Sequence, residues 1–450
     1  MKKLVTQNML MRLSGMGLCL AVVFALATSF VPTRMAHAQE ADQAPKPQKT
    51  RRVPSMSEAV YKKLAEAQEA IDAKDYPTAE KVLRDMLARS KRYNANEIGQ
   101  VHNMLGYVAF LREDFKAAIR EYKIVVAQGE DIPEGLETTT LYTLAQLSFV
   151  EGQFQDALDY METWITKATN PGPEPRIFMG QVYYQMKNFP RAIEQIESGI
   201  SIAKERGTDI KENWWQLLNY LYFEQENMPK VIEILEILVR DFPKRDYWVR
   251  LAGMYGQEGD DVKHLHTLQA AYEGDFLTKE SDLTNLAGLF LQQEVPFSAA
   301  KVLEKGIADD IVEPSSKNLR ALGQAWQLAQ EVDKAIPVLE DAAKSADDGR
   351  IFDQLSYVYL EADRFNDCVR SANSALNKGG LRKKQSTYFV RGLCLYNNED
   401  LNDARRSMVS CRNEARRAED NLNIRTCSQW ITFIDREQDR NAQLAAASGQ

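Results

Sequence analysis

The chain has few of the residues that build most catalytic and metal sites. Its 450 residues include only four histidines and five cysteines, and none of these stands in an H-E-x-x-H, C-x-x-C or related ligand spacing. A Gly-rich phosphate loop and a G-x-S-x-G nucleophile elbow are absent as well. These absences argue against an enzyme, and we expect no cofactor and no bound metal ion.

The residues that come closest to such sites have simpler explanations. His264 and His266 are near each other in sequence, but side chains two residues apart on a helix point to different faces. No cysteine or carboxylate accompanies them at ligand spacing, so we interpret them as packed or half-exposed residues. Adjacent acids between the expected helices are better explained as helix caps than as catalytic pairs; these are Asp260-Asp261, Asp309-Asp310 and Asp347-Asp348.

A long apolar run occurs only at the start of the chain. Lys2, Lys3 and Arg12 precede an apolar stretch at 13–31, and Ala36-His37-Ala38 follows it. This is the layout of a secretory signal peptide, which we assign to residues 1–38 with cleavage after Ala38. The mature protein would then be exported, and the resemblance given at the end of this section implies the periplasm as its compartment. The alternative is an uncleaved membrane anchor, since the run is nearly long enough to span a bilayer.

The chain also has fewer basic residues than acidic ones. The chain has 56 Lys and Arg against 64 Asp and Glu, a formal charge of -8, and loss of the four cations in residues 1–38 would make it -12. An acidic body without a basic cluster argues against nucleic acid as a partner. Its acidity could steer a basic partner toward it, or could simply keep the protein soluble.

The two ends of the mature chain are poor in large apolar residues. Residues 39–56 are rich in Gln, Pro, Lys and Arg, and we expect them to form a flexible tether. Residues 441–450 consist mainly of Ala, Ser, Gly and Gln, and we expect a disordered tail. Residues 57–440 lie between these segments and are helix-like throughout.

Residues 57–440 contain a repeated sequence pattern. Trp215, Leu218, Asn219 and Tyr222 show it most clearly: a large residue, a Leu three later, a small residue, and an aromatic residue three further on. A second helix with a small residue twelve positions after the first follows in each unit. Ten such pairs recur at spacings of 33 to 39 residues: 67/79, 106/118, 145/157, 180/192, 219/231, 252/264, 287/299, 323/335, 356/368 and 392/404.

This pattern resembles the tetratricopeptide repeat, a helical hairpin of about 34 residues. It implies an all-α fold, a right-handed α-solenoid of about ten hairpins. An aromatic or apolar residue is expected to fill the turn before the second helix of several hairpins, namely Tyr76, Phe115, Phe154, Phe189, Phe365 and Leu401. The apolar stripe between Asn421 and Asp439 predicts a C-terminal capping helix.

Four cysteines remain after the signal peptide, and all lie near the end of the array. Four cysteines allow three connectivities. Cys368 begins one helix and Cys394 lies late in the next, whereas Cys411 lies late in one helix and Cys427 lies early in the next. Because successive helices run antiparallel, we favour the disulfides Cys368–Cys394 and Cys411–Cys427. Free thiols of a redox site are the alternative, although no C-x-x-C supports one.

The tetratricopeptide resemblance also implies a binding surface, because the first helix of each hairpin lines the concave groove. Lys and Arg residues that would clamp a carboxylate are scarce there, with only Lys317 and Arg320 in place. Aromatic rings and amides are the alternative recognition groups. The expected partner-binding residues are Asn103, Tyr107, Phe110, Tyr142, Gln146, Phe149, Gln181, Tyr184, Gln216, Tyr220 and Phe223. Packing between repeats is the competing explanation for several of these rings. Further positions in the same register are Ile177, Gln324, Gln327, Asp353, Tyr357, Phe389 and Tyr396.

A second resemblance concerns the start of the mature chain. The segments Lys49–Met56 and Tyr61–Gln68, together with the signal peptide, are similar to periplasmic repeat proteins encoded beside TonB–ExbB–ExbD systems. This implies an accessory of TonB-dependent energy transduction and iron uptake that binds an extended segment of a TonB-complex protein. A scaffold for outer-membrane or cell-wall assembly is the alternative, and an enzyme or an enzyme inhibitor is a more distant one.

Overall fold

The computed structural model describes residues 51–448, and all of their regular elements are helices. The predicted signal peptide and residues 39–50 of the predicted tether lie outside this range. The chain divides into two compact units, residues 1–231 (unit 1) and 232–450 (unit 2), and the boundary falls within one helix. No helix of the described residues is long and apolar enough to cross a bilayer.

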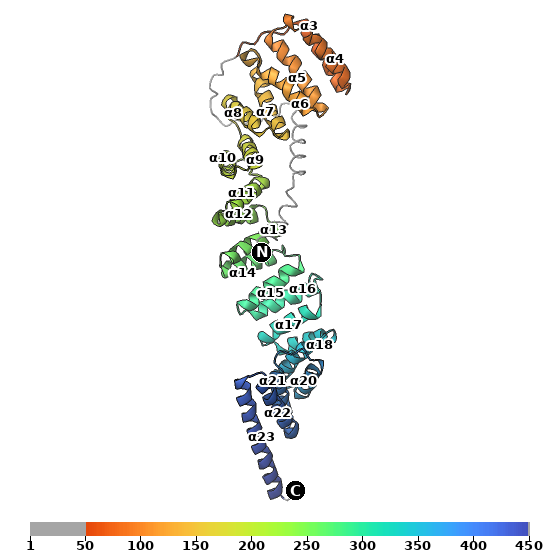
Figure 1. Cartoon of the computed structure of the whole chain (residues 1–450), viewed down its shortest axis with the longest axis vertical. Coiled ribbons are helices and arrows are strands. Elements are labelled where there is room, and N and C mark those ends of the chain that lie inside the picture. Colours follow the sequence, from red (N-terminus) through yellow and green to blue (C-terminus); the bar gives the residue numbers. More distant parts are fainter. Residues whose placement is uncertain (1–50, 449–450) are drawn as a thin grey trace. The chain divides into compact units, whose positions relative to one another are not determined.

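Five hairpins start in unit 1, and the second helix of the fifth continues into unit 2 (Figure 1). Two short 3-10 turns, η1 (Ser90–Arg92) and η2 (Gly129–Asp131), follow the first and second of them. The paired helices are α3 (Glu58–Asp72) and α4 (Tyr76–Leu87), α5 (Ala95–Leu111) and α6 (Phe115–Val126), α7 (Glu134–Val150) and α8 (Phe154–Lys167), α9 (Glu174–Gln185) and α10 (Phe189–Arg206), and α11 (Glu212–Glu224) and α12 (Met228–Asp241). The last of these contains the unit boundary.

Unit 2 continues with five more hairpins and a final helix. Its paired helices are α13 (Arg245–Gln257) and α14 (Asp261–Glu273), α15 (Glu280–Gln292) and α16 (Pro296–Ala308), α17 (Ser316–Leu328) and α18 (Val332–Lys344), α19 (Arg350–Glu361) and α20 (Phe365–Lys378), and α21 (Lys384–Asn397) and α22 (Leu401–Arg417). The last helix is α23 (Asn421–Ser448), which packs on α22. The predicted fold of about ten hairpins and a capping helix is therefore confirmed.

The small residues of the pattern mark where the two helices of a hairpin touch. A Cβ added at Gly180 would lie 2.5 Å from the side chain of Ile196, and one at Gly323 would lie 2.4 Å from Leu339. Real side chains do not approach so closely, so only glycine fits there without displacing its neighbour.

Two positions of the small-residue pattern hold larger residues, Asn219 and His264, and nearby contacts accommodate each of them. Asn219 is 1% exposed and donates its amide to the carbonyl of Val231 at 2.9 Å, so its buried polar group is satisfied. His264 is half-buried, and its ring fills the space beside Gly256, where a Cβ would meet it at 2.7 Å. The structure therefore uses His264 for packing.

Each hairpin turn has the same construction. A residue with positive φ stands two positions before every second helix: Lys74, Glu113, Gly152, Lys187, Glu226, Gly259, Glu294, Gln330, Asp363 and Glu399. This left-handed residue ends the first helix, and a side-chain cap then starts several of the second helices. Asp260 is one such cap and accepts from the backbone of Lys263. The predicted role of this acid in capping is confirmed.

The first described residues differ from the expected flexible tether. Arg51 donates to the Glu137 carboxylate at 2.7 Å and to the Ile132 carbonyl at 3.3 Å. The carbonyl of Pro54 accepts from Asn96 at 2.9 Å. Residues 51–56 are thus held against α5, η2 and α7, because buried carboxylate and amide groups there bind an extended backbone and its guanidinium group. We call residues 51–57 the N-terminal strap.

The expected disordered tail also differs in its described part. Helix α23 continues to Ser448, so residues 441–448 are helical. Alanine has the highest helix propensity, and this segment contains three consecutive alanines, which explains why the helix does not stop at Asp439.

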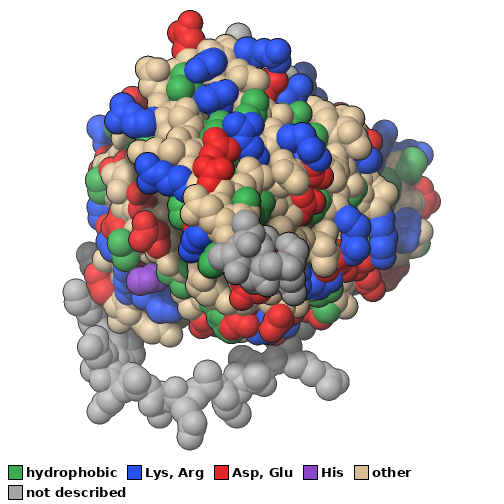
Figure 2. Space-filling model, turned by 90° about the horizontal axis from the view of Figure 1, so that it is seen from below, with side chains coloured by type: hydrophobic (Ala, Val, Ile, Leu, Met, Phe, Trp, Pro, Cys, Tyr) green, Lys and Arg blue, Asp and Glu red, His purple; other side chains and the backbone are tan. Residues whose placement is uncertain are grey.

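Charge is distributed unevenly along unit 2. Residues 232–363 hold 25 Asp and Glu against 13 Lys and Arg, whereas residues 364–430 hold 7 acids against 13 cations. Several Lys and Arg side chains lie near one another when the molecule is seen from the end that carries α23 (Figure 2). The net charge of the whole chain averages over this difference between the two segments.

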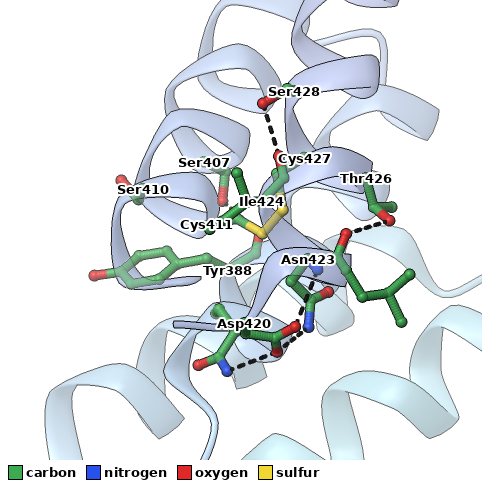
Figure 3. The surroundings of a disulfide bond; sticks show 12 residues. Tyr388, Ser407, Ser410, Cys411, Asp420, Asn423, Ile424, Thr426, Cys427 and Ser428 are labelled. Atoms are coloured by element: carbon green, nitrogen blue, oxygen red, sulfur yellow. Dashed lines mark hydrogen bonds between the residues drawn. A yellow bond between two sulfur atoms is a disulfide. The ribbon is translucent and has the colours of Figure 1, made fainter. Parts of the chain in front are cut away.

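Two disulfides join helices of unit 2. They are Cys368–Cys394 between α20 and α21, and Cys411–Cys427 between α22 and α23 (Figure 3). All four cysteines are fully buried. This is the pairing expected from antiparallel neighbouring helices, and it ties the last hairpins and the capping helix to one another.

Candidate functional site

The candidate site is the row of side chains that α5, α7, α9 and α11 present, which we call the first-helix face of unit 1. Its members lie three positions before, or one or four positions after, the small residue of each first helix. All eleven predicted residues lie on these helices. Ten of them are half-buried or exposed, and Phe149 is buried.

Two tyrosines from neighbouring hairpins meet at the α9–α11 end of this face. The rings of Tyr184 and Tyr220 lie edge to face with centroids 5.8 Å apart, a favourable geometry for aromatic pairs. Tyr184 also stacks on Phe189 at 6.3 Å, and Phe189 begins α10. Burial, together with the nearby Glu224 and Tyr184, raises the pKa of Tyr220 above its ordinary value, so the phenol stays neutral at physiological pH. Both tyrosines remain half-buried.

Other predicted rings turn toward neighbouring helices. Phe149 is 9% exposed and packs on Phe178 of α9 at 5.6 Å and on Phe154 at 5.9 Å. Tyr142 meets Trp164 of α8 at 5.3 Å, and burial raises the pKa of Tyr142. Phe149 therefore belongs to packing between repeats, which the sequence analysis left open as the competing explanation.

Amide side chains lie between these rings. Within residues 51–448, the side chains of Asn103, Gln146 and Gln181 make no hydrogen bond, although each is only half-buried. Gln216 differs, because its amide donates to Glu212 at 3.1 Å. An amide offers both donors and an acceptor, so the three unbonded amides can pair with the backbone of a bound peptide.

Acids lie at the ends of three first helices of unit 1. Asp72, Glu174 and Glu224 are exposed, six positions before or five positions after the small residue of α3, α9 and α11. No Lys or Arg lies three positions before, or one or four positions after, the small residue of the five first helices. Lys211 lies 3.8 Å from Glu174 and is the nearest cation to that carboxylate. The face therefore combines aromatic rings, free amides and negative charge.

The sequence analysis missed one group of buried polar residues in unit 1. Asn96, Glu97 and Glu137 are 7%, 3% and 5% exposed, and they hold the N-terminal strap. Ser57 donates its backbone N–H and hydroxyl to Glu97 at 2.8 and 2.7 Å. The available signal was Asn94 with Glu97, a capping box at the start of α5.

Part of the chain matches a known protein family. Residues 64–133, which run from α3 to the loop after η2, match the family model described as "Tetratricopeptide repeat". The chain matches no curated protein sequence.

Several solved structures resemble the chain at low identity. A tetratricopeptide repeat protein from Parabacteroides merdae is 15% identical, with 60% of this chain and 99% of that one covered and a TM-score of 0.35. MamA is 18% identical, with 38% and 94% covered and a TM-score of 0.31. The TPR2AB-domain:pHSP90 complex of yeast Sti1 is 12% identical, with 67% and 99% covered and a TM-score of 0.25.

Proposed function

We propose that the first-helix face of unit 1 binds an extended segment of a partner protein. Residues 64–133 match a tetratricopeptide repeat model, and such repeats form protein-interaction scaffolds. The observation that carries the proposal is the Tyr184–Tyr220 pair, which stays half-buried beside the unbonded amide of Gln181. Aromatic rings give large contact area at low entropy cost, and amides can pair with a peptide backbone.

The composition of the face favours a basic, proline-rich segment. Proline-rich peptides adopt a preformed extended helix that docks on aromatic surfaces. Asp72, Glu174 and Glu224 would attract Lys or Arg, and tyrosine rings also bind cations. An acidic peptide would meet only like charge at these positions.

The finer assignment is an accessory of a TonB-dependent energy-transduction and iron-uptake system in the periplasm. It is supported by the similarity of Lys49–Met56 and Tyr61–Gln68 to repeat proteins of such systems. The two buried disulfides are consistent with an oxidising compartment. TonB-type proteins, which as a family have a basic and proline-rich periplasmic segment, match the charge and the rings of the face.

Site-specific crosslinking in cells tests both the proposed binding surface and the TonB assignment. A photo-reactive phenylalanine analogue replaces Gln146 or Gln181 on the face. Two control positions are Ile124, which is 38% exposed on the second helix α6, and Gln324, which holds the register position of Gln181 in unit 2. We expect crosslinks from Gln146 and Gln181 to a TonB-complex protein and none from the controls.

The other outcomes are equally informative. Equal crosslinking from Ile124, or none from Gln146 and Gln181, would reject the first-helix face as the binding surface. Crosslinks from the face to outer-membrane or cell-wall assembly proteins would keep the surface and replace the TonB assignment with that alternative.

A further inference from the structure

A second surface lies on the capping helix, outside the first-helix face. Three large apolar residues of α23 are exposed, Leu422, Phe433 and Leu444, at 73%, 43% and 60%. The covered part of the Phe433 ring contacts Tyr396 of α21 and Trp430, with centroids 5.6 and 5.5 Å away. Leu422, Phe433 and Leu444 are eleven residues apart, and eleven residues are about three helical turns. The three side chains therefore form one stripe that runs about 33 Å along the helix.

Two arginines stand in the same stripe. Arg425 and Arg436 are exposed and make no hydrogen bond or ion pair with any residue of the described chain. Nearby cations differ, because Arg405 pairs with Asp435 at 2.5 Å and Arg440 pairs with Glu437. Arg425 lies within the basic segment 364–430 described above, and Arg436 follows that segment.

The stripe also borders a hollow. An open depression of about 540 Å³ lies along the first half of α23, and its lining is Asn421, Ile424, Arg425, Ser428, Gln429 and Thr432. The opposite side of α23 is already used, since Cys427 bonds to α22 and Ile431 and Ile434 pack on α21 and α22. The stripe is thus the side where a following repeat would stack.

We propose that this side of α23 docks an acidic amphipathic helix of a partner protein. Apolar residues at helical spacing fit a helix partner, because two helices bury such stripes against each other. Asp or Glu beside the partner's apolar residues would pair with Arg425 and Arg436. A second copy of α23 is a poor occupant, because antiparallel pairing would bring these arginines near their own counterparts.

Charge-swapped peptides test this docking with the full chain. The probe is a labelled 24-residue helix with Leu on one side and Glu beside it, and the matched probe replaces each Glu with Lys. We expect the Glu peptide to bind, and the double variant Arg425→Glu/Arg436→Glu to weaken it at least tenfold. The same variant should gain affinity for the Lys peptide. The control Lys279→Glu reverses an exposed, unpaired cation elsewhere in unit 2 and should change neither affinity.

Other results would overturn the proposal. These are equal binding of the two peptides, no loss in the double variant, or no gain for the Lys peptide. Leu422→Asp is a second, single-site variant that should also weaken the Glu peptide. Binding of anionic vesicles that the Glu peptide does not displace would assign the stripe to a membrane surface. Sedimentation that finds a dimer lost in Arg425→Glu/Arg436→Glu would assign it to a second copy. These readouts are independent of the crosslinks in unit 1.

Discussion

Units 1 and 2 are built from the same hairpin, but their first helices use polar residues differently. In unit 2, Arg245 pairs with Asp282 at 2.5 Å, Asn318 donates to Glu280 at 2.9 Å, and Thr387 donates to Asp353 at 2.6 Å. Each pair joins neighbouring first helices. The amides Gln146 and Gln181 of unit 1 lie at a different position of their first helices and make no bond within the described chain. Gln324, the amide at that position in unit 2, makes none either.

At these pairs the first helices of unit 2 satisfy their polar groups internally, whereas the Gln146 and Gln181 amides of unit 1 are available. A ligand on unit 2 would have to break hydrogen bonds before making its own, and the net gain would be small. A ligand on unit 1 would replace only water. We therefore place the first binding surface in unit 1, although both units have the same repeat.

The largest expected effect concerns the disulfides. Within the described residues, both disulfides join helices of unit 2 and none joins helices of unit 1. Closing loops with sequence separations of 26 and 16 residues stabilises by about 3 kcal/mol each in the chain-entropy model. Denaturation, reduction and refolding under reductant should therefore destabilise unit 2 and leave unit 1 nearly unchanged. Hydrogen exchange measured by mass spectrometry would report each unit separately. Equal loss of protection in unit 1 would contradict the comparison.

Phe149→Ala tests which rings of unit 1 hold repeats together. Because Phe149 is buried against Phe178, we expect a loss of about 4 kcal/mol in the free energy of unfolding. Tyr184→Ala, at a half-buried ring, should cost about 1 to 2 kcal/mol and should weaken partner binding. Denaturant unfolding of both variants measures this. A smaller cost for Phe149→Ala than for Tyr184→Ala would reverse their assigned roles.

Asp282→Ala tests the polar pairs of unit 2. The Asp282 carboxylate is 5% exposed and accepts two hydrogen bonds from Arg245. Its removal leaves a half-buried guanidinium without this partner, and we expect a loss of about 3 kcal/mol. Gln146→Ala is the matched change in unit 1 and should cost less than about 0.5 kcal/mol. Similar unfolding midpoints for the two variants would remove the basis of the comparison.

The strap of unit 1 should respond to acid. Burial alone would raise the pKa of Glu97, but hydrogen bonds from the backbone and hydroxyl of Ser57 and from the backbone of Asn94 lower it below 4.5. The resulting stability, about 1 to 2 kcal/mol, is present above the ordinary pKa and is lost as the pH falls through the lower folded value. Glu97→Gln should abolish this pH dependence in an unfolding titration. An unchanged acid profile would exclude Glu97 as its source.

The smallest effect should have the opposite sign and lies in unit 2. Burial raises the pKa of Asp353, while Thr387 and Arg320 oppose the shift. A carboxyl group with a raised pKa costs stability once it ionises, and the cost is relieved as the pH falls. Asp353→Asn should therefore stabilise the protein at pH 7 by less than about 1 kcal/mol, and the gain should shrink in acid. Destabilisation at pH 7 would show that Arg320 outweighs burial.

The sequence predicts the fold well because the repeat is a local signal. Glycines such as Gly180 and Gly323 are required by contacts within one hairpin, so their spacing predicts the helices directly. The turns add a second local signal, because Asp260 caps the helix that follows it.

The site is predicted less well because exposure depends on neighbouring hairpins. Phe149 and Tyr184 occupy the same register, yet Phe178 covers the first, while Tyr220 leaves the second half-exposed. The strap was missed because Arg51 and Glu137 are far apart in sequence. The basic segment 364–430 was missed because one net charge was taken for the whole chain.

A titration of the full chain with a labelled Lys-Pro repeat peptide tests the central claim most directly. The account predicts saturable binding that weakens at least tenfold in Tyr184→Ala/Tyr220→Ala and that is unchanged in Tyr357→Ala, the tyrosine at the register position of Tyr220 in unit 2. Circular dichroism would verify that each variant folds. Equal binding by the wild type and the unit 1 variant, or a loss confined to Tyr357→Ala, would contradict it.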